Sequence, residues 1–520
     1  MKKHQVIFKP YNQDQLNILP PSLEELIPKN HLVRAVDKIV EKMKIDPLLD
    51  KYKGGGTSSY HPKMLLKVVI YAYTEKIYSS RAISKSIREN IHYMWLSGGN
   101  RPDFRTINRF RSSRLKGVIE KVFTSLISIL TEEGYLKLEH YFLDGTKIEA
   151  NANKYSWVWK KSTERYKMSL EKKIKELLKD IERKNDQENQ EYGDRDLEEL
   201  GEESNLTEDK LDEAVKKIDE LLKKEPKDKG LKKSRMILQG DYIPRYKNYK
   251  TQEENLGDRN SYSKTDIDAT FMRMKDDHMN NGQLKPAYNV QMGTENQFIL
   301  GWSIHQKLAD TSLLIPHIEK IKQMIKKLPP RIIADAGYGS QENYEYLEKE
   351  GKEAFVKYNN FYIQQRRNYK TNKYIREHLR YNKENDEFMC PEGKKLKYIK
   401  TKSYKTDNGY QTERRIYESE DCGGCPVKEQ CNKSRYNRRI YYSPRLEKLQ
   451  EKAREKLLSE EGIKLRGKRS VDVESVFGQI KQNMGFRRFL LRGLENVNIE
   501  YGLLAFAHNL KKVSNLRLAS

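Results

Sequence analysis

The spacing of apolar residues predicts helices over the first quarter of the chain. Apolar side chains recur every three to four positions over residues 23–43. They recur again over residues 62–76, where Pro62 stands near the first turn of the predicted helix. The glycines at 54–56 separate the two stretches. We therefore expect residues 1–138 to form an all-helical N-terminal region.

Two short basic stretches of this region suggest a contact with DNA. Residues 79–88 and 104–111 contain small and basic residues, and they bracket a turn at residues 98–103. This pattern is compatible with a helix-turn-helix unit that docks on DNA. An ordinary basic helical bundle accounts for it equally well. The hypothesis is that the N-terminal region binds DNA.

From residue 141 onward the pattern changes to short apolar runs typical of strands. The first run covers residues 141–150, and a hairpin is expected around residues 293–297. The other predicted elements are strands at 287–292 and 298–305, a helix at 312–327, a strand at 331–334, a helix at 341–350 and a strand at 353–357. Together they predict a mixed α/β sheet over residues 139–358.

A first interruption of this sheet, at residues 160–241, carries two helical seams. In each seam apolar residues alternate at spacings of four and three, and an acidic stretch separates the two seams. The seam residues are Leu170, Ile174, Leu177 and Ile181, followed by Leu211, Val215, Ile218 and Leu222. We predict a helical hairpin insertion whose seams pack together and whose charged faces are solvated.

A second interruption, at residues 359–441, contains every cysteine of the chain. The four are Cys390, Cys422, Cys425 and Cys431, and the pair Cys422-Gly-Gly-Cys425 has the spacing of a metal-binding knuckle. We predict that four thiolates hold one structural Zn²⁺ and thereby stabilise a small, polar, β-rich module. Four reduced thiols, or one redox pair, are the alternatives.

The charge of the chain points to a polyanionic partner. Lys and Arg number 100 against 75 Asp and Glu, a formal net charge of +25. Cations that neutralise DNA phosphates release condensed counterions, so this excess favours nucleic-acid binding. No run approaches the roughly 20 apolar residues that span a bilayer, and the first residues lack the apolar stretch of a secretory signal. We expect a cytoplasmic protein that associates with DNA and not with a membrane.

Three acidic residues stand where a sheet and a covering helix would expose them. Asp144 follows a short apolar run, and Asp335 closes the strand at 331–334. Glu474 lies in residues 442–520, which are predicted to be the helical C-terminal part of the α/β region. If the two strands are neighbours, the three carboxylates can hold a pair of divalent cations, Mg²⁺ or Mn²⁺. Such a pair activates the nucleophile and stabilises the leaving oxygen of a phosphodiester.

Each of these acids also has a simpler interpretation. A strand-terminal Asp followed by Gly is more often a turn former than a ligand. Glu149 and Asp472 flank the predicted acids and are alternative ligands, whereas Asp310 is expected to cap the helix that follows it. Lys481 lies seven positions after Glu474, or two helical turns, and is expected to contact a DNA phosphate on the same side.

Motifs along nearly the whole chain carry a resemblance to a known family. They are Leu23 to His31, Tyr60 to Met64, Trp95 to Arg111, Asp144-Gly-Thr, Ala287-Tyr-Asn-Val-Gln291, Ala334-Asp-Ala-Gly-Tyr338, Val473 to Lys481 and Ala507-His-Asn-Leu-Lys511. In these motifs the chain resembles DDE transposases of bacterial insertion sequences, specifically the IS-eleven-eighty-two-like branch of the IS-four-like group.

The resemblance implies an RNase H-like catalytic core with Asp144, Asp335 and Glu474 as the DDE triad. It also implies a protein that binds the terminal inverted repeats of its element, cleaves there and joins 3′-hydroxyl ends to target DNA, as a homodimer that pairs two ends. A signature of Tyr, Arg, Glu and Lys surrounds the last acid in the related group. Here Lys481 fits, and no Tyr stands at its expected position. Arg469, the candidate for a second phosphate contact, precedes Glu474 by five positions, one more than the signature has.

Two rival functions stay open at the level of sequence. One is a DNA-binding protein, domesticated from a transposase or degenerate, that has no catalysis. The other is a metal-dependent nuclease that cuts DNA without joining ends.

Overall fold

The computed structural model describes residues 21–52, 58–192, 206–274, 284–325 and 327–519. The chain forms two compact units. One unit combines Met1–Leu136 with Tyr501–Ser520, and the other is Lys137–Glu500. The last helix, α20 (Leu494–Ala519), therefore belongs mostly to the N-terminal unit, whereas we had expected residues 442–520 to continue the α/β region.

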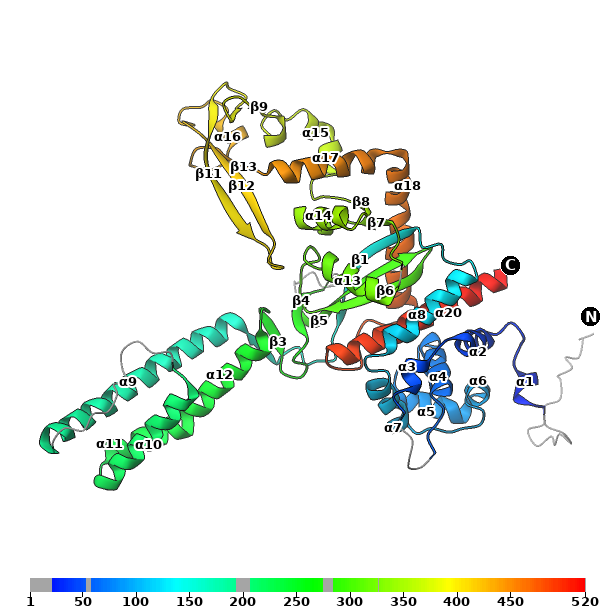
Figure 1. The fold of residues 1–520 in the computed structure, drawn as a ribbon, viewed down its shortest axis with the longest axis horizontal. Coiled ribbons are helices and arrows are strands. Elements are labelled where there is room, and N and C mark those ends of the chain that lie inside the picture. The colour runs from blue at the N-terminus through cyan, green and yellow to red at the C-terminus, as the bar shows by residue number, and fades with distance from the viewer. Residues whose placement is uncertain (1–20, 53–57, 193–205, 275–283, 326, 520) are drawn as a thin grey trace, which may run out of the picture. The chain divides into compact units, whose positions relative to one another are not determined.

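The described part of the N-terminal unit is built from helices (Figure 1). These are α1 (Leu23–Leu26), α2 (Leu32–Lys42), α3 (Asp46–Leu49), α4 (Pro62–Thr74), α5 (Ser80–Glu89), α6 (Ile91–Leu96), α7 (Phe104–Arg109), α8 (Ile119–Glu132) and most of α20. The helix expected over residues 23–43 is broken between α1 and α2. Pro28 explains the break, because it has no N–H to donate and holds Ile27 in extended backbone. The glycines at 54–56 lie outside the described residues.

A six-stranded mixed sheet forms the centre of the second unit. Its strands are β1 (His140–Glu149), β4 (Thr270–Arg273), β5 (Leu284–Glu295), β6 (Phe298–His305), β7 (Arg331–Ala334) and β8 (Glu353–Val356). Strand β5 pairs antiparallel with β1, β4 and β6, whereas β1, β7 and β8 run parallel to one another. The predicted mixed α/β sheet is confirmed, and β6 and β7 occupy the predicted residues.

Helices from distant parts of the sequence pack on this sheet. Helix α13 (Leu314–Met324) packs on β6, and α14 (Gln341–Lys349) and α17 (Pro444–Leu458) pack on β8. Helix α18 (Glu460–Arg469) lies against β7 and β8. The helix that leads into the turn with the last predicted acid thus lies against the strand that precedes the second acid.

Four helices interrupt the sheet between β1 and β4. They are α9 (Lys160–Tyr192), α10 (Glu208–Lys224), α11 (Lys229–Ile237) and α12 (Ile243–Leu256). Two short strands, β2 (Trp157–Trp159) and β3 (Ser261–Ser263), pair antiparallel at the two ends of the insertion. Five of the eight seam residues are buried in its apolar cluster, and Leu177, Val215 and Leu222 lie at the margin. Helix α12 leads the chain back to the sheet, so the insertion extends beyond residue 241, where the hairpin was expected to end.

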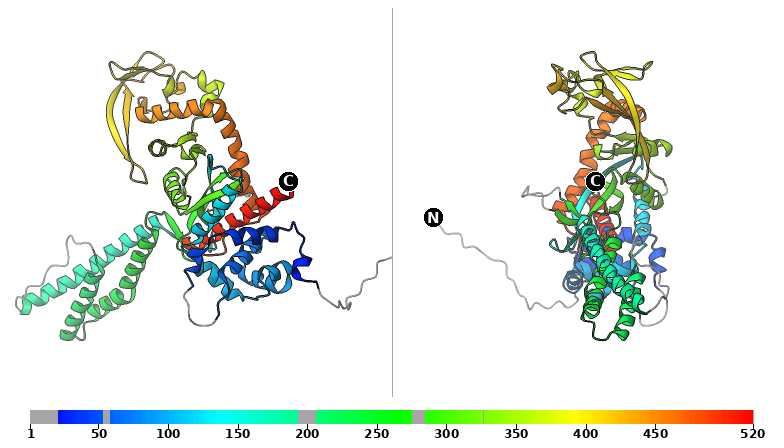
Figure 2. Two further views of the ribbon diagram at one scale, coloured as in Figure 1. Left: turned by 45° about the vertical axis from the view of Figure 1, so that its right-hand side comes forward. Right: turned by 90° about the vertical axis from the view of Figure 1, so that its left-hand side faces the viewer.

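The segment that contains the cysteines forms a separate five-stranded antiparallel sheet (Figure 2). Its strands are β9 (Arg380–Asn382), β10 (Glu387–Met389), β11 (Lys395–Lys405), β12 (Gln411–Ser419) and β13 (Arg439–Tyr442). The buried cluster beneath it is small and includes Phe388, Leu396 and Tyr417. A core of this size stabilises a fold weakly, because the apolar area removed from water is limited.

The close packing of β1 on β5 generates a stability prediction at Gly293. A Cβ at this position would lie 1.8 Å from Cζ of Tyr141, a fully buried side chain whose hydroxyl is 2.7 Å from Nε2 of His317. The ring cannot shift without losing that hydrogen bond. We expect Gly293→Ala to lower the free energy of unfolding by about 1–3 kcal/mol, as overpacking does, measured by urea denaturation.

The matched control is Gly240→Ala, where nothing lies within 4 Å of the added Cβ. Gly240 is in a helical turn, so alanine there should leave stability unchanged or raise it by up to about 1 kcal/mol. Equal effects of the two substitutions would show that Tyr141 is not held as the structure describes.

Candidate active site

Asp144 lies on β1, and Asp335 directly follows β7, the parallel neighbour of β1. Phe142 of β1 is opposite Ile333 of β7, and two further residues along this register place position 144 opposite position 335. Asp144 is not at a strand end, as the sequence suggested, because β1 continues to Glu149. The edge arises instead because β7 stops at Ala334 and leaves β1 without that neighbour. The strand ending thus opens the sheet at the two acids.

Local hydrogen bonds orient both carboxylates. Oδ1 of Asp144 accepts a bond of 2.8 Å from the N–H of Gly145. Oδ1 of Asp335 accepts one of 2.9 Å from the N–H of Gly337 and caps the short 3₁₀ turn Ala336–Tyr338. Asp144 is only 9% exposed. A backbone N–H group thus fixes the position of one oxygen of each carboxylate.

Arg469 connects the first acid to the third. Its Nη2 donates a hydrogen bond of 2.5 Å to Oε1 of Glu474, and its Nη1 lies 3.5 Å from Oδ2 of Asp144. The guanidinium is almost completely buried, whereas the Glu474 side chain is 47% exposed. The structure therefore brings Asp144 and Glu474 to opposite ends of one cation.

A π-helical turn accounts for the unusual spacing of Arg469 and Glu474. Residues Ser470–Glu474 adopt this wider turn directly after α18. Because a π-helix bonds residue i to i+5, it accommodates one residue more per turn than an α-helix does. Arg469 thus reaches Glu474 across five positions, and the extra residue relative to the family signature does not separate the pair.

π-Helical turns also affect Lys481, which was expected to lie on the same side of a helix as Glu474. The predicted alignment of Lys481 with Glu474 assumed an uninterrupted α-helix. The chain instead passes from the first π-helical turn to α19 (Ser475–Gly478) and then to a second one at Gln479–Asn483. A spacing of seven no longer means two full turns, so the phosphate contact of Lys481 stays a prediction.

Asp310 is a fourth carboxylate of the site, and sequence reasoning gave it the wrong role. Its Oδ1 accepts hydrogen bonds from Nδ2 of Asn289 at 2.8 Å and from Nε2 of Gln291 at 2.9 Å. It does not cap α13 with its side chain; its backbone carbonyl accepts from the N–H of Leu313, which precedes that helix. The sequence did contain one sign of this role. Asn289 and Gln291 lie two positions apart, on the same face of a buried strand, and buried amides need hydrogen-bond partners such as a carboxylate.

The absence of a side chain at position 145 permits this arrangement. A Cβ on Gly145 would lie 2.4 Å from Nε2 of Gln291 and 2.8 Å from Oδ1 of Asp310. The glycine next to Asp144 thus lets Asp310 and its amide partner approach β1.

The electrostatic environment of Tyr338 shows that several of the acids lie near one another. Its buried hydroxyl donates to Oε1 of Gln291. Burial raises the pKa of this phenol well above its ordinary value, and the charges of Asp310, Asp144 and Asp335 raise it further. Arg469 acts on that pKa in the opposite direction. The phenol of Tyr338 thus lies within the electrostatic influence of three carboxylates and one guanidinium.

The two alternative acids have structural partners. Glu149 forms ion pairs with Lys285 at 3.3 Å and Arg488 at 3.8 Å, at the far end of β1. Oδ1 of Asp472 accepts from the hydroxyl of Thr294 at 2.7 Å and from the N–H of Gln297 at 3.0 Å. Asp472 thereby attaches the π-helical turn to the β5–β6 hairpin.

All four cysteines line one small cavity. They form no disulfide. Backbone N–H groups lie 3.2 Å from Sγ of Cys390 and 3.4 Å from Sγ of Cys422, and Nη1 of Arg438 lies 2.7 Å from Sγ of Cys431. Three of the four sulfur atoms thus have an N–H group as a neighbour.

Metal binding stays a prediction at both places. Among the residues that the structure describes, no group of three or more His, Cys, Asp or Glu side chains is arranged to hold a metal ion. In both places an arginine, Arg469 or Arg438, lies against the predicted ligands. The donor sets nevertheless fit the two ions: hard carboxylate oxygens for Mg²⁺ and four thiols around one cavity for Zn²⁺.

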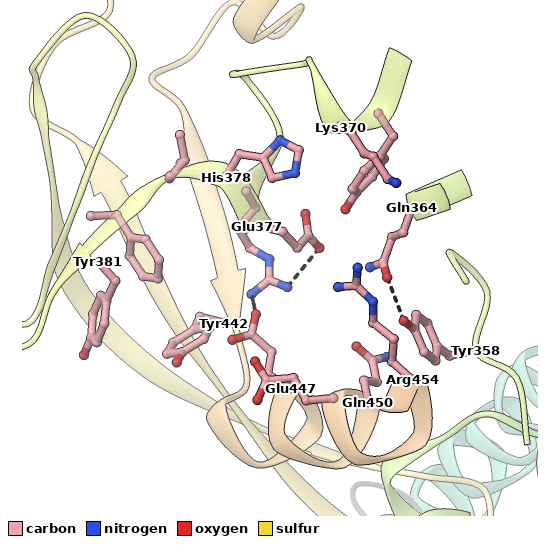
Figure 3. Close-up of a pocket in the computed structure, with 15 residues that line it drawn as sticks. Tyr358, Gln364, Lys370, Glu377, His378, Tyr381, Tyr442, Glu447, Gln450 and Arg454 are labelled. Carbon is pink, nitrogen blue, oxygen red and sulfur yellow. Dashed lines mark hydrogen bonds and ion pairs between the residues drawn. The ribbon is translucent and has the colours of Figure 1, made fainter. Parts of the chain in front are cut away.

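A larger cavity of about 370 Å³ lies outside the acid cluster (Figure 3). Tyr358, Tyr442 and Arg454 contribute to its walls, and Arg376 pairs there with Glu447. Its described lining includes none of the predicted acids or cysteines. The pairing of its charges gives the cavity no clear preference for an anion or a cation.

Two family models match the chain. Residues 389–514 match the one described as "Transposase DDE domain", and residues 21–113 match the one described as "Transposase domain (DUF772)". The chain carries two transposase domains. The DDE domain match contains Glu474, Arg469, Lys481 and all four cysteines, and the DUF772 match spans α1 to α7.

Other comparisons add nothing to this assignment. No curated protein and no solved structure matched the chain. The two matched segments cover less than half of the sequence and do not include Asp144 or Asp335. Within the described residues, none of the helices combines the length and apolar character that a membrane crossing requires.

The position of Asp310 generates a prediction for transposase chemistry. Asn at this position can still accept hydrogen bonds from Asn289 and Gln291 through its carbonyl oxygen, so the fold should persist while one negative charge is lost. If the acid cluster cleaves DNA with a divalent cation, Asp310→Asn should slow that cleavage by about 10²-fold, comparable to loss of one electrostatic group in an active site. A gel assay on labelled duplex DNA measures the rate.

Asp209→Asn is the control, because Asp209 is exposed on the helical insertion. Its cleavage rate should equal that of the unaltered protein. An Asp310→Asn protein that also cleaves at the normal rate would show that Asp310 only supports the amides of β5.

Proposed function

We propose that the protein is a transposase that binds the terminal inverted repeats of its own insertion sequence, cleaves phosphodiester bonds there and joins the 3′-hydroxyl ends to target DNA. One observation carries the proposal. Asp144 lies on β1, Asp335 directly follows the neighbouring parallel strand β7, and Arg469 contacts both Glu474 and Asp144 within a chain that has a DDE domain. Duplex DNA is the partner, and two copies of the chain are needed to bring two ends together.

The mixed sheet is then the RNase H-like core. Its central strand β1 carries the first acid, the neighbouring strand β7 leads into the second, and the segment after α18 supplies the third. The helical insertion lies between the first and second acids in the chain. The cysteine-containing module lies between the second and the third. Both leave the strand pairing around the acids intact.

Asp144, Asp335 and Glu474 would hold divalent cations, two per site, with Asp310 close by. Mg²⁺ or Mn²⁺ between such ligands supplies an activated nucleophile and neutralises the leaving oxygen. The guanidinium of Arg469 between Asp144 and Glu474 supports this assignment, because it shows that a positive charge is accommodated between the two acids.

Arg469 and Lys481 would contact DNA phosphates next to the scissile bond. A guanidinium binds phosphate through two parallel N–H groups. Arg469 can exchange its carboxylate partners for a phosphate once cations neutralise the acids. This exchange keeps a buried arginine paired throughout, which avoids the cost of leaving its charge unsatisfied.

The triad predicts a sharp loss of catalysis without loss of binding. Asp144→Asn, Asp335→Asn and Glu474→Gln should each reduce Mg²⁺-dependent cleavage of inverted-repeat DNA by about 10³-fold or more, since each removes a metal ligand. Affinity for the same DNA, measured by fluorescence anisotropy, should stay within about threefold, because one carboxylate contributes little to phosphate contacts. Asp258→Asn, an exposed acid after α12, is the control and should retain full activity.

The assay also separates the rival functions. Normal cleavage by all three triad variants would refute the proposal. Binding of repeat ends by the unaltered protein without cleavage in Mg²⁺ or Mn²⁺ would establish a DNA-binding protein instead. Cleavage without joining of pre-cut ends to target DNA would establish a nuclease.

We further propose that Cys390, Cys422, Cys425 and Cys431 hold one structural Zn²⁺. The purified protein should contain about one zinc per chain, as a four-thiolate site requires. Cys422→Ser should release it and loosen the small sheet, which has little apolar core of its own. Elemental analysis measures the zinc, and near-ultraviolet circular dichroism measures the packing of the module's tyrosines. A zinc-free protein whose four thiols all react with a thiol reagent under native conditions would contradict the site.

A further inference from the structure

Strands β11 and β12 form a long two-stranded ribbon that extends beyond the small core of the cysteine-containing module (Figure 1). Nine residue pairs join the strands, from Leu396 opposite Ser419 to Lys405 opposite Gln411. Side chains at the outer end, from Lys400 to Lys405, are mostly exposed on both faces. Burial of apolar side chains therefore does not explain why the ribbon extends so far from the module.

The charges of the ribbon divide it into two halves. Residues 395–419 contain seven Lys and Arg against three Asp and Glu. Near the module, cations pair with acids: Lys395 with Glu387 at 2.9 Å, and Lys397 with Glu420. The outer half contains five further cations. One of them, Arg415, lies 3.7 Å from a carboxylate oxygen of Asp386. The other four are Lys400, Lys402, Lys405 and Arg414, and none of these pairs with a carboxylate in the described part of the chain.

Two of these cations are held close together on one aromatic ring. Lys402 lies directly opposite Arg414 in the strand register. Nζ of Lys402 is 5.2 Å and Cζ of Arg414 is 4.8 Å from the centre of the Tyr404 ring. Like charges directly opposite each other destabilise a strand pair, and the ring offsets only part of that cost. An anion between the two cations would relieve the repulsion.

The tip of the ribbon is anchored beside the acid cluster. The side chain of Asn408 donates to the carbonyl of Ser312 at 3.1 Å and accepts from Nζ of Lys307 at 3.5 Å. These two residues flank Asp310 in the chain. The hydroxyl of Tyr410 donates to Glu345 of α14 at 2.8 Å. The unpaired cations therefore lie on an element that is fixed to the loop of the fourth carboxylate.

We propose that the β11–β12 ribbon is a DNA-binding arm that contacts the phosphate backbone of the duplex next to the cleaved bond. The inference rests on the proposed function and adds an interaction surface to it. A two-stranded ribbon fits the major groove of B-DNA, and Lys and Arg on its exposed face neutralise phosphates on the groove walls. Because these contacts are to the backbone, the arm binds without regard to sequence.

The salt dependence of binding tests the arm. The full-length protein is titrated onto a labelled DNA duplex of arbitrary sequence between about 50 and 200 mM salt. For Lys402→Gln/Arg414→Gln we expect about tenfold weaker binding at the higher salt concentration. We also expect the slope of log K against log salt to become shallower by about 1.8, the value for two lost phosphate contacts.

Lys395→Gln/Lys397→Gln is the matched control, since it removes the same charge from the same ribbon at positions already paired with acids. It should change the slope little. Equal losses for both double variants, or no loss for Lys402→Gln/Arg414→Gln, would overturn the inference. Tighter binding of duplex RNA than of DNA by the unaltered protein would also overturn it.

Two further measurements keep the test decisive. If Lys402→Gln/Arg414→Gln fails to fold, Lys400→Gln/Lys405→Gln probes the same outer half without removing a cation that contacts Tyr404, and it should show the same shallower slope. Cleavage by the unaltered protein distinguishes the two proposals. A wrong assignment of the arm leaves that cleavage in place, whereas a wrong proposed function shows as no cleavage at all.

Discussion

The ion pairs of Arg469 hold two carboxylates of the site in one place. Four acidic side chains gather around Tyr338 or Arg469, and their mutual repulsion would separate them without a compensating charge. Arg469 is buried, and its two partners come from β1 and from the turn after α18. Breaking one pair would leave a buried charge uncompensated, which costs more than losing an exposed salt bridge. The position of the turn Ser470–Glu474 beside β1 therefore depends on this contact.

A second set of contacts makes the interior of the sheet polar at the site. Asn289 and Gln291 project from β5 toward Asp310, and Gly145 leaves the space for them. Buried amides are costly without partners, and here Asp310, Tyr338 and each other satisfy them. A network of this kind fixes one geometry, because a shift of any member leaves another unpaired. The orientation of Asp310 is thus a property of the whole network and not of its own loop.

The helical insertion and the cysteine-containing module differ in how they are attached to the α/β sheet that carries the acids. The helical insertion packs its own apolar cluster and is closed at its base by the pairing of β2 with β3. The cysteine-containing module has a smaller core, yet its ribbon returns to the core at Asn408 and Tyr410. The hydrogen bonds at Asn408 and Tyr410 hold the ribbon in place although it has little apolar core of its own. Its side chains can therefore be charged and exposed without loss of core packing. This is the physical basis for assigning the ribbon, and not the insertion, to DNA.

Much of the local structure follows from the sequence. Short apolar runs predicted the strands β6 and β7, helical spacing predicted the seams of the insertion, and the positions of Asp144, Asp335 and Glu474 singled out the acids. These features depend on neighbours in the chain, whose periodicity the sequence displays directly. The cysteine spacing likewise indicated four side chains that prove to share one cavity.

Tertiary structure alone decided the rest. The early end of β7 leaves the acid in the middle of β1 without a neighbouring strand on that side, and a π-helical turn brings Arg469 onto Glu474. The side chain of Asp310 does not cap a helix, because it accepts hydrogen bonds from amides of a distant strand. The last helix divides between two units. Each outcome is set by packing and hydrogen bonds between residues far apart in the chain, and no local pattern encodes which partner a side chain will meet.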